Sequence, residues 1–444
     1  MRPVVPGGLL AAVDALSERP VTATEKGFGR LAWTEPVSAA KLAASRPSLF
    51  GGGFVLPIMV LRESAVRGNI QSMAAYCAAA GVRLAPHGKT TMAPQLLALQ
   101  LAAGAWGITA ATMAQAQVFR SFGVPRILIA NEVTDRAAIE WLADELAADQ
   151  DFDCYCFVDS LAAVALLEDG MRAAASRRRD TGPGRPVRAL VELGRAGGRA
   201  GCRSVDEAVT VAKAVTASSG LRLAGAAGYE GSIGHDDSET TLAAIAEFCR
   251  DLRRLGTLMS ALPGCEADYI LSAGGSAYFD IVIRQLTAEA GGGAPTVLLR
   301  SGAYISHDHG FYDRLTPAGR PGRDGPALVP AFELWAPVLS RPEPGLAIVG
   351  AGRHDVAFDQ DMPVPLQVCP AGGPSAGAAD AHGMHISAVD DQHGYLRLPA
   401  DAALAPGDLI CLGISHPCTT FDKWRVIPVV DDGYRVIDAI HTFF

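Results

Sequence analysis

A regular alternation of short β-rich runs with helical runs, which begins after about residue 52, constrains the fold of this chain more than any other feature. Alternating strands and helices predict a parallel sheet, and eight such units over roughly 250 residues are typical of a TIM-type (β/α)8 barrel. A doubly wound open sheet is the alternative that the same pattern allows. The eight expected strands are Val55–Leu61, Val82–Ala85, Gly107–Ala111, Arg126–Ala130, Asp153–Val158, Val187–Leu193, Leu221–Tyr229 and Tyr269–Ser272.

The pattern changes near Thr296, where proline and glycine become frequent and short β-like runs follow. Such runs predict a second, mainly β domain. We therefore expect an N-terminal segment of residues 1–50, a barrel of residues 51–295 and a C-terminal β domain of residues 296–444. The expected strands of the β domain are Leu346–Val349, Tyr395–Leu398, Asp408–Leu412, Val426–Val430 and Val436–Ile440.

Composition narrows the class of protein. Hydrophobic residues make up 49% of the 444 positions, which permits a large buried core, and the formal net charge of −9 argues against a nucleic-acid partner. The nine cysteines show no disulfide framework, so we expect a cytoplasmic protein. Pro94, Gly104 and Gly107 interrupt the uncharged stretch of residues 90–119, which therefore predicts buried elements and no membrane span.

Lys89 is the first candidate for chemistry. It follows the second expected strand in the run Pro86–Thr90, at the barrel edge where active sites lie. A lysine there can form a Schiff base with an aldehyde cofactor or a carbonyl substrate. An ordinary surface lysine is the alternative interpretation. The chain has only five lysines, and this one opens an uncharged stretch, which favours a functional role.

Gly274, Gly275 and Ser276 form the second candidate, just after the eighth expected strand. Adjacent glycines let backbone N–H groups approach an anion, and a helix that starts near Ser276 would add its positive end. A plain tight turn is the alternative. Barrels often hold a phosphate with the loops after their last strands, and a lysine beside a phosphate cradle is what pyridoxal phosphate needs.

His416 and Cys418 form the third candidate. Two residues apart on an extended segment, an imidazole and a thiolate share a face and can reach one ion. These ligand types favour zinc. The alternative is a core cysteine beside a structural histidine. His393 is kept as a possible neighbour of the metal, whereas His307 and His309 are interpreted as loop residues.

Eight motifs occur in an order that resembles one family, the D-threonine aldolase and D-serine dehydratase group. This group is the metal-dependent branch of the fold-type III, alanine-racemase-like pyridoxal-phosphate enzymes. The resemblance covers roughly residues 50–440 and raises the Schiff-base interpretation of Lys89. The motifs are Pro86–Thr90, Gly107–Thr112, Ile127–Asn131, Gly228–Gly231, Ser272–Gly275, Arg300–Tyr304, Asp391–Gly394 and His416–Cys418.

The resemblance implies a barrel, a β domain built partly from the N-terminal segment, and a homodimer. By motif match, Lys89 would hold the cofactor aldehyde and Tyr229 would contact the cofactor. His416 and Cys418 would bind the divalent metal, with zinc favoured and manganese possible. Aldolase members typically have His-x-Asp there, so His-x-Cys resembles the dehydratase-like, amino acid deaminase branch. The phosphate would bind Gly274, Gly275 and Ser276.

The resemblance also implies a lyase that acts on small D-β-hydroxy amino acids. Dehydration of a D-serine or D-threonine type substrate to a 2-oxo acid and ammonia is the favoured reaction. Retro-aldol cleavage to glycine and an aldehyde is the alternative, and a non-catalytic pyridoxal-phosphate-binding protein is the second alternative. A racemase is disfavoured, because it normally needs an acid or base on each cofactor face. The sequence assigns no role to His87.

Overall fold

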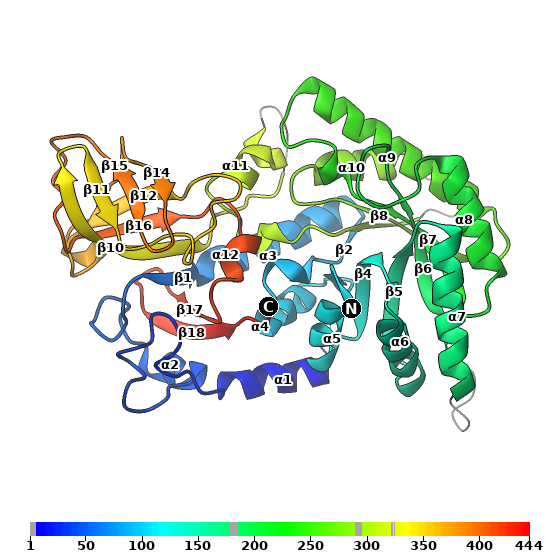
Figure 1. Cartoon of the computed structure of the whole chain (residues 1–444), viewed down its shortest axis with the longest axis horizontal. Helices are drawn as coiled ribbons and strands as arrows, with labels where there is room; N and C mark the ends of the chain where they lie inside the picture. The colour runs from blue at the N-terminus through cyan, green and yellow to red at the C-terminus, as the bar shows by residue number, and fades with distance from the viewer. Residues whose placement is uncertain (1–5, 178–184, 289–294, 321–322, 324) are drawn as a thin grey trace.

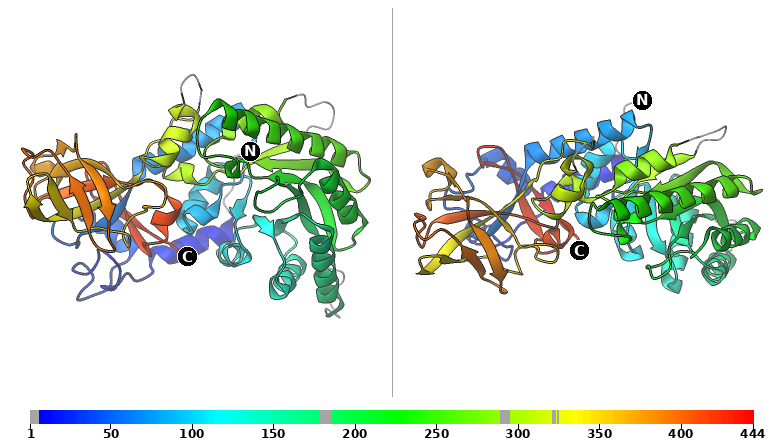
Figure 2. Two further views of the ribbon diagram at one scale, coloured as in Figure 1. Left: turned by 45° about the horizontal axis from the view of Figure 1, so that its top comes forward. Right: turned by 90° about the horizontal axis from the view of Figure 1, so that it is seen from above.

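The computed structural model describes residues 6–177, 185–288, 295–320, 323 and 325–444. Two bodies lie side by side along the long axis of the molecule (Figures 1 and 2). One is a ring of parallel strands surrounded by helices, and the other consists of mainly antiparallel strands (Figure 1). The predicted (β/α)8 barrel and the predicted second, mainly β domain are both confirmed.

Eight strands form the barrel, and every hydrogen-bonded pair in the order β2-β9-β8-β7-β6-β5-β4-β3 is parallel. Backbone hydrogen bonds from Trp106 to Leu84 (2.7 Å) and from Thr109 to Pro86 (2.9 Å) join the two end strands. The carboxyl ends of all eight strands therefore meet at one rim. The strands are β2 (Arg83–Leu84), β3 (Ile108–Ala110), β4 (Arg126–Glu132), β5 (Asp153–Val158), β6 (Val187–Leu193), β7 (Leu221–Gly228), β8 (Cys265–Ala273) and β9 (Thr296–Leu299).

Polar side chains start several of the helices that surround the barrel. Thr112, Asp135, Ser204 and Ser238 each accept a hydrogen bond from a backbone N–H in the first turn of the following helix. These N–H groups have no partner inside the helix, so each cap stabilises a helix start. The helices are α3 (Glu63–Ala79), α4 (Pro94–Ala102), α5 (Met113–Ser121), α6 (Arg136–Ala148), α7 (Leu161–Arg177), α8 (Val205–Ala217), α9 (Glu239–Ser260) and α10 (Phe279–Leu286).

The second domain is a sheet in which β1 is a central strand, antiparallel to β10 and parallel to β17. Two short helices, α11 (Phe311–Leu315) and α12 (Cys418–Phe421), face the barrel from this part of the chain (Figure 1). The strands are β1 (Ile58–Arg62), β10 (Phe332–Glu343), β11 (Leu346–Val349), β12 (Val364–Cys369), β13 (Ala379–Asp380), β14 (His385–Val389), β15 (Gly394–Arg397), β16 (Leu409–Gly413), β17 (Val426–Val430) and β18 (Val436–His441).

The prediction of the barrel strands is wrong at both ends. The run expected as the first barrel strand, Val55–Leu61, corresponds to β1, which pairs only with strands of the second sheet. The eighth barrel strand is instead β9, which lies beyond the expected end of the barrel and pairs with β2 and β8. Both runs are apolar and buried, and apolarity alone does not identify the sheet that a strand joins.

The N-terminal segment packs on the second sheet. Its helix α2 (Ala39–Ser45) lies against β18, and Phe28 and Leu42 share one buried cluster with Trp335 of β10. Helix α1 (Gly7–Ser17) instead packs against α4 of the barrel. The first fifty residues therefore touch both bodies.

All nine cysteines lie in the described residues and carry free thiols, in agreement with the absence of a predicted disulfide framework. None of the described helices combines the length and the apolar character that crossing a membrane requires.

We expect Phe28→Ala to lower the free energy of unfolding by about 3–5 kcal/mol, the usual cost of truncating a buried aromatic ring. Phe28 is 0% exposed and packs edge-on against Phe54 at 5.6 Å between ring centroids. Trp33→Ala is the control, since Trp33 is 77% exposed. Chemical denaturation followed by fluorescence measures both. Equal midpoints for the two variants would contradict the structural role of the segment.

Candidate active site

A cavity of about 490 Å³ opens at the rim where the carboxyl ends of the barrel strands meet the loops of the second domain. All the site residues singled out from the sequence line it, although they come from distant parts of the chain. The structure therefore brings them together on one cavity, while their chemical roles stay predictions. They are Lys89, Tyr229, Gly274, Gly275, Ser276, His416 and Cys418.

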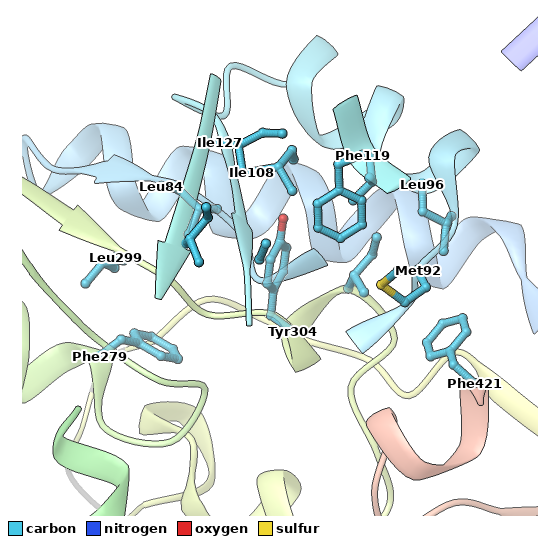
Figure 3. Packing of buried hydrophobic residues seen from close by; sticks show 14 of the residues in the cluster. Leu84, Met92, Leu96, Ile108, Phe119, Ile127, Phe279, Leu299, Tyr304 and Phe421 are labelled. Atoms are coloured by element: carbon cyan, nitrogen blue, oxygen red, sulfur yellow. The ribbon is translucent and has the colours of Figure 1, made fainter. Parts of the chain in front are cut away.

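Lys89 lies on a 3-10 turn, η1 (Gly88–Thr90), directly after β2. The ring of Phe119 packs so closely that a Cβ at Gly88 would lie 2.6 Å from it, so only glycine fits before the lysine. Phe119 and Ile108 belong to the apolar cluster beside this turn (Figure 3). In the part of the chain that the structure describes, Lys89 has no carboxylate partner and its side chain faces the cavity.

The backbone N–H groups of the glycine pair are already engaged. Gly274 and Gly275 donate hydrogen bonds of 2.9 and 2.6 Å to the two carboxylate oxygens of Glu230. Glu230 is fully buried and begins the turn η2 (Glu230–Ser232) that follows β7. This carboxylate was not among the site residues predicted from the sequence, although it belongs to the Gly228–Gly231 motif.

A second group of backbone N–H donors, which could bind an anion, lies beside the glycine pair. The N–H groups of Gly302 and Ala303 both point at Ser276 Oγ, at 3.3 and 3.1 Å. All three residues line the cavity. A Cβ at Gly302 would lie 2.5 Å from Thr90 Oγ1, so this turn also requires glycine. The signal that could have identified it is a glycine shortly after the end of β9, in the motif Arg300–Tyr304.

Arg300 supplies a buried positive charge to the cavity wall. It is 5% exposed and donates hydrogen bonds to Ser272 Oγ (2.6 Å) and to the carbonyl of Gly228 (2.7 Å). Its guanidinium also lies 5.5 Å from the ring centroid of Phe157. Arg199 lies over the ring of Tyr229 at 5.2 Å. Two guanidinium groups thus flank the cavity beside Lys89.

Two carboxyl groups share a hydrogen bond at the ends of β4 and β6. Burial, followed by the charge of Glu132, raises the pKa of Glu192 to about 8, and burial also raises the pKa of Glu132. Each side chain keeps one buried oxygen without a partner, Oε1 of Glu132 and Oε2 of Glu192. At neutral pH, the pair therefore holds one proton, and Glu192 presents it beside the cavity.

His416 and Cys418 lie side by side where α12 begins. Burial lowers the pKa of His416, but hydrogen bonds with Cys418 and Asp359 outweigh it and raise the value to about 9. Burial raises the pKa of the Cys418 thiol, but the hydrogen bond from His416 lowers it overall. Cys418 also donates to Thr90 Oγ1 at 3.5 Å. An imidazole beside an ionisable thiol is a donor set that suits zinc.

The other histidines considered in the sequence lie apart from this pair. His393 is exposed in the turn between β14 and β15 and does not line the cavity. His307 is buried and His309 is half-buried, each has an Nδ1 atom without a partner, and neither lines the cavity. His87 does line it, and burial, followed by the charge of Lys89, lowers its pKa. Among the described residues, no cluster of three or more His, Cys, Asp or Glu side chains is arranged to hold a metal.

Comparisons with known proteins match both domains. Residues 61–279 match the family model described as "Alanine racemase, N-terminal domain", and residues 331–430 match "Putative serine dehydratase domain". A D-threonine aldolase from Arthrobacter is 29% identical over 385 residues, which is 85% of this chain and 89% of the relative. A D-threo-3-hydroxyaspartate dehydratase from Delftia is 28% identical over 52% of this chain and 63% of its own length.

One solved structure agrees with this match in three dimensions. The D-threonine aldolase from Filomicrobium marinum superposes with a TM-score of 0.71 and 26% identity, and the match covers 87% of this chain and 94% of that one. The resemblance stated from the sequence motifs is therefore confirmed.

We expect Glu192→Gln to change how stability depends on pH. A carboxyl whose pKa is about 8 in the folded chain and roughly 4 when unfolded stabilises the fold fully at low pH, and this stabilisation is lost as pH rises through about 8. The glutamine does not titrate, so the Tm of the variant relative to the native protein should increase from pH 5 to about pH 8. Thermal scans across this range measure the difference.

Glu247→Gln, an exposed change on α9, is the control and should leave the difference in Tm independent of pH. A pH-independent difference for Glu192→Gln would contradict a shared proton at the cavity wall.

Proposed function

We propose that this chain, whose residues 61–279 match the alanine racemase N-terminal domain and whose residues 331–430 match the putative serine dehydratase domain, is a lyase that acts on D-β-hydroxy amino acids with pyridoxal phosphate and a divalent metal. This proposal rests on one observation: a single cavity is lined by Lys89, by residues whose N–H and hydroxyl groups can bind an anion, and by His416 and Cys418. The curated relatives are an aldolase and a dehydratase, so both cleavage and dehydration belong to the class.

The cavity residues fit the cofactor. Lys89 would hold the aldehyde, because its amine faces the cavity without a carboxylate partner among the described residues. Ser276, Gly302 and Ala303 would hold the phosphate, since two backbone N–H groups and a hydroxyl converge there. Gly274 and Gly275 would form the wall beside it, with their N–H groups on Glu230. Bound pyridoxal phosphate supplies an electron sink for negative charge at Cα.

Tyr229 would pack against the cofactor from the cavity wall next to Gly275. Its ring lies at the end of β7, and a Cβ at Gly275 would lie 3.1 Å from it, so the glycine lets the phenol approach. Burial raises the pKa of Tyr229 to about 12, so its hydroxyl stays protonated and can donate a hydrogen bond. Arg300 and Arg199 would balance the negative charge of a phosphorylated ligand.

His416 and Cys418 would hold the metal, which supplies Lewis-acid chemistry at the β-hydroxyl oxygen of the substrate. In its uncharged form, the amine of Lys89 would remove the proton from Cα, as a general base within the same cavity. The β-hydroxyl would leave as hydroxide and take up a proton to become water, and water would then hydrolyse the released enamine, through its imine form, to a 2-oxo acid and ammonia. We favour this dehydration because a cysteine occupies the ligand position, with zinc as the metal and manganese as the alternative.

Retro-aldol cleavage is the second candidate, and one specific observation favours it. The aldolase from Arthrobacter matches 85% of this chain, whereas the dehydratase from Delftia matches 52%. Cleavage would need a base at the β-hydroxyl proton instead of at Cα.

We further propose a cytoplasmic homodimer, on the basis of the family resemblance and of nine free thiols.

We expect D-serine and D-threonine to yield 2-oxo acid and ammonia, the L-amino acids to yield neither, and a chelator to stop the reaction. Coupled assays for 2-oxo acid, ammonia, glycine and aldehyde separate the two reactions. Glycine and aldehyde as the main products would establish the aldolase alternative.

Lys89→Ala should lower kcat by at least about 10²–10⁴-fold, as for loss of a general base. Lys213→Ala, on the surface of α8, is the matched control.

We expect Ser276→Ala to weaken pyridoxal phosphate binding by about tenfold, the effect of one lost hydrogen bond to a charged group. Spectroscopic titration of the apoprotein measures the Kd, and pyridoxal without the phosphate should bind both proteins equally. Ser260→Ala, an exposed change on α9, is the control. Unchanged affinity in Ser276→Ala would contradict the phosphate assignment.

A further inference from the structure

We propose that Asp359 is the positioning residue that fixes the His416 ring with its proton on Nδ1, so that Nε2 is left free to bind the metal. This inference rests on the proposed function, because it assigns a purpose to the ring that the metal would use. Neither the sequence motifs nor the cavity lining identifies Asp359, which lies in the loop between β11 and β12.

The carboxylate of Asp359 has both oxygens engaged with one end of α12. Its Oδ2 lies 2.6 Å from His416 Nδ1, and its Oδ1 accepts a hydrogen bond of 2.6 Å from Thr419 Oγ1. Thr419 Oγ1 also lies 3.2 Å from His416 Nδ1. Because the threonine gives its proton to Asp359, both oxygens near Nδ1 are acceptors there. The proton between them must therefore belong to the imidazole nitrogen.

A protonated Nδ1 determines where the lone pair of a neutral imidazole lies. Only Nε2 then has a lone pair available for a cation. Histidine ligands of metals commonly donate their other N–H to a carboxylate, which sets the tautomer and makes the ring a stronger ligand. Cys418, two residues on, lines the same cavity, so the nitrogen and the sulfur can serve one ion.

Contacts on both sides of Asp359 hold its loop in place. Lys26 of the N-terminal segment pairs with Asp355 at 3.2 Å, and the N–H of Ala357 donates to Thr420 Oγ1 at 3.3 Å. After Asp359, the carboxylate of Asp361 pairs with Arg314 at 2.7 Å. These contacts come from the N-terminal segment, from α12 and from α11, respectively.

An ordinary surface ion pair is the competing interpretation, since the side chain of Asp359 is 37% exposed. Such a pair contributes little, and its loss changes nothing at a cavity. Three features oppose it here: both oxygens are used, the loop is fixed on both sides, and the His416 side chain is only 16% exposed. The two interpretations differ in what happens to metal affinity.

The first test measures zinc affinity of the full-length protein by competition with a chromogenic chelator. We expect Asp359→Ala to weaken zinc binding by about 10–100-fold, the usual effect of removing such a carboxylate. Asp359→Glu should recover part of the loss. Asp422→Ala, at the opposite end of α12, is the matched control and should keep native affinity, because its carboxylate is exposed and, within the described part of the chain, contacts only Lys423 at 3.8 Å. Native affinity in Asp359→Ala would overturn the proposal.

The second test needs no metal. Nitrogen NMR of the ¹⁵N-histidine-labelled, metal-free protein reports which ring nitrogen carries the proton, and His416→Gln identifies the signal. Above the His416 pKa of about 9, where the ring is neutral, we expect the Nδ1–H tautomer in the native protein and in Asp422→Ala, and its loss in Asp359→Ala. An unchanged tautomer in Asp359→Ala would also overturn the proposal.

The two tests separate this inference from the proposed function. If His416→Ala and Cys418→Ala bind zinc as tightly as the native protein, the proposed metal site is wrong. A tautomer change in Asp359→Ala would still uphold the positioning role of Asp359 in that case. If the two ligand variants lose zinc but Asp359→Ala does not, the metal site stands and the positioning role is refuted.

Discussion

Closure of the barrel between β2 and β3 is the constraint on which the candidate site depends. Two backbone hydrogen bonds and the bond from Thr109 Oγ1 to the carbonyl of Ala85 (2.7 Å) join these strands directly before the turn that bears Lys89. Because the residues after β2 are tied to β3, the turn cannot drift away from the rim. Phe119 then fills the space beside Gly88 and gives the turn a single arrangement.

The charges around the cavity follow from the burial of the groups that carry them. Arg300 and Glu230 are both buried; Arg300 bonds to residues at the ends of β7 and β8, and Glu230 accepts from the two glycines that follow β8. A buried charge is tolerated when such partners replace water. The rim is therefore a fixed arrangement of cations and acceptors, in which the N–H groups of Gly302 and Ala303 converge on Ser276 Oγ, and a bound anion would replace this hydroxyl as their acceptor.

Local patterns were sufficient to predict the barrel, the second domain and most of the residues that meet at the cavity, whereas Tyr229 was assigned only by the family resemblance. Lys89 and Ser276 follow strands whose ends must share a rim, and this rule needs no knowledge of the third dimension. The exchange of β1 and β9 was not predictable, because strand pairing joins residues far apart in sequence. Glu230 and Asp359 were not predicted from the sequence for the same reason. Each acts through a partner that is distant in the chain or hidden in a turn.

Lys89 belongs to the barrel, whereas Cys418 belongs to the second domain, and the two bodies meet along a seam that is part of one buried apolar cluster. The C-terminal residues form this seam: the N–H of Phe443 donates to the carbonyl of Met92 at 3.0 Å, and Gln95 bonds to the carbonyl of Ala439 at 3.3 Å. Phe421 of α12 lies next to Met92 (Figure 3). The distance from the Lys89 amine to the Cys418 sulfur therefore depends on how the two bodies pack against each other. Substitutions along this seam would therefore change that distance even if Lys89 and Cys418 themselves were retained.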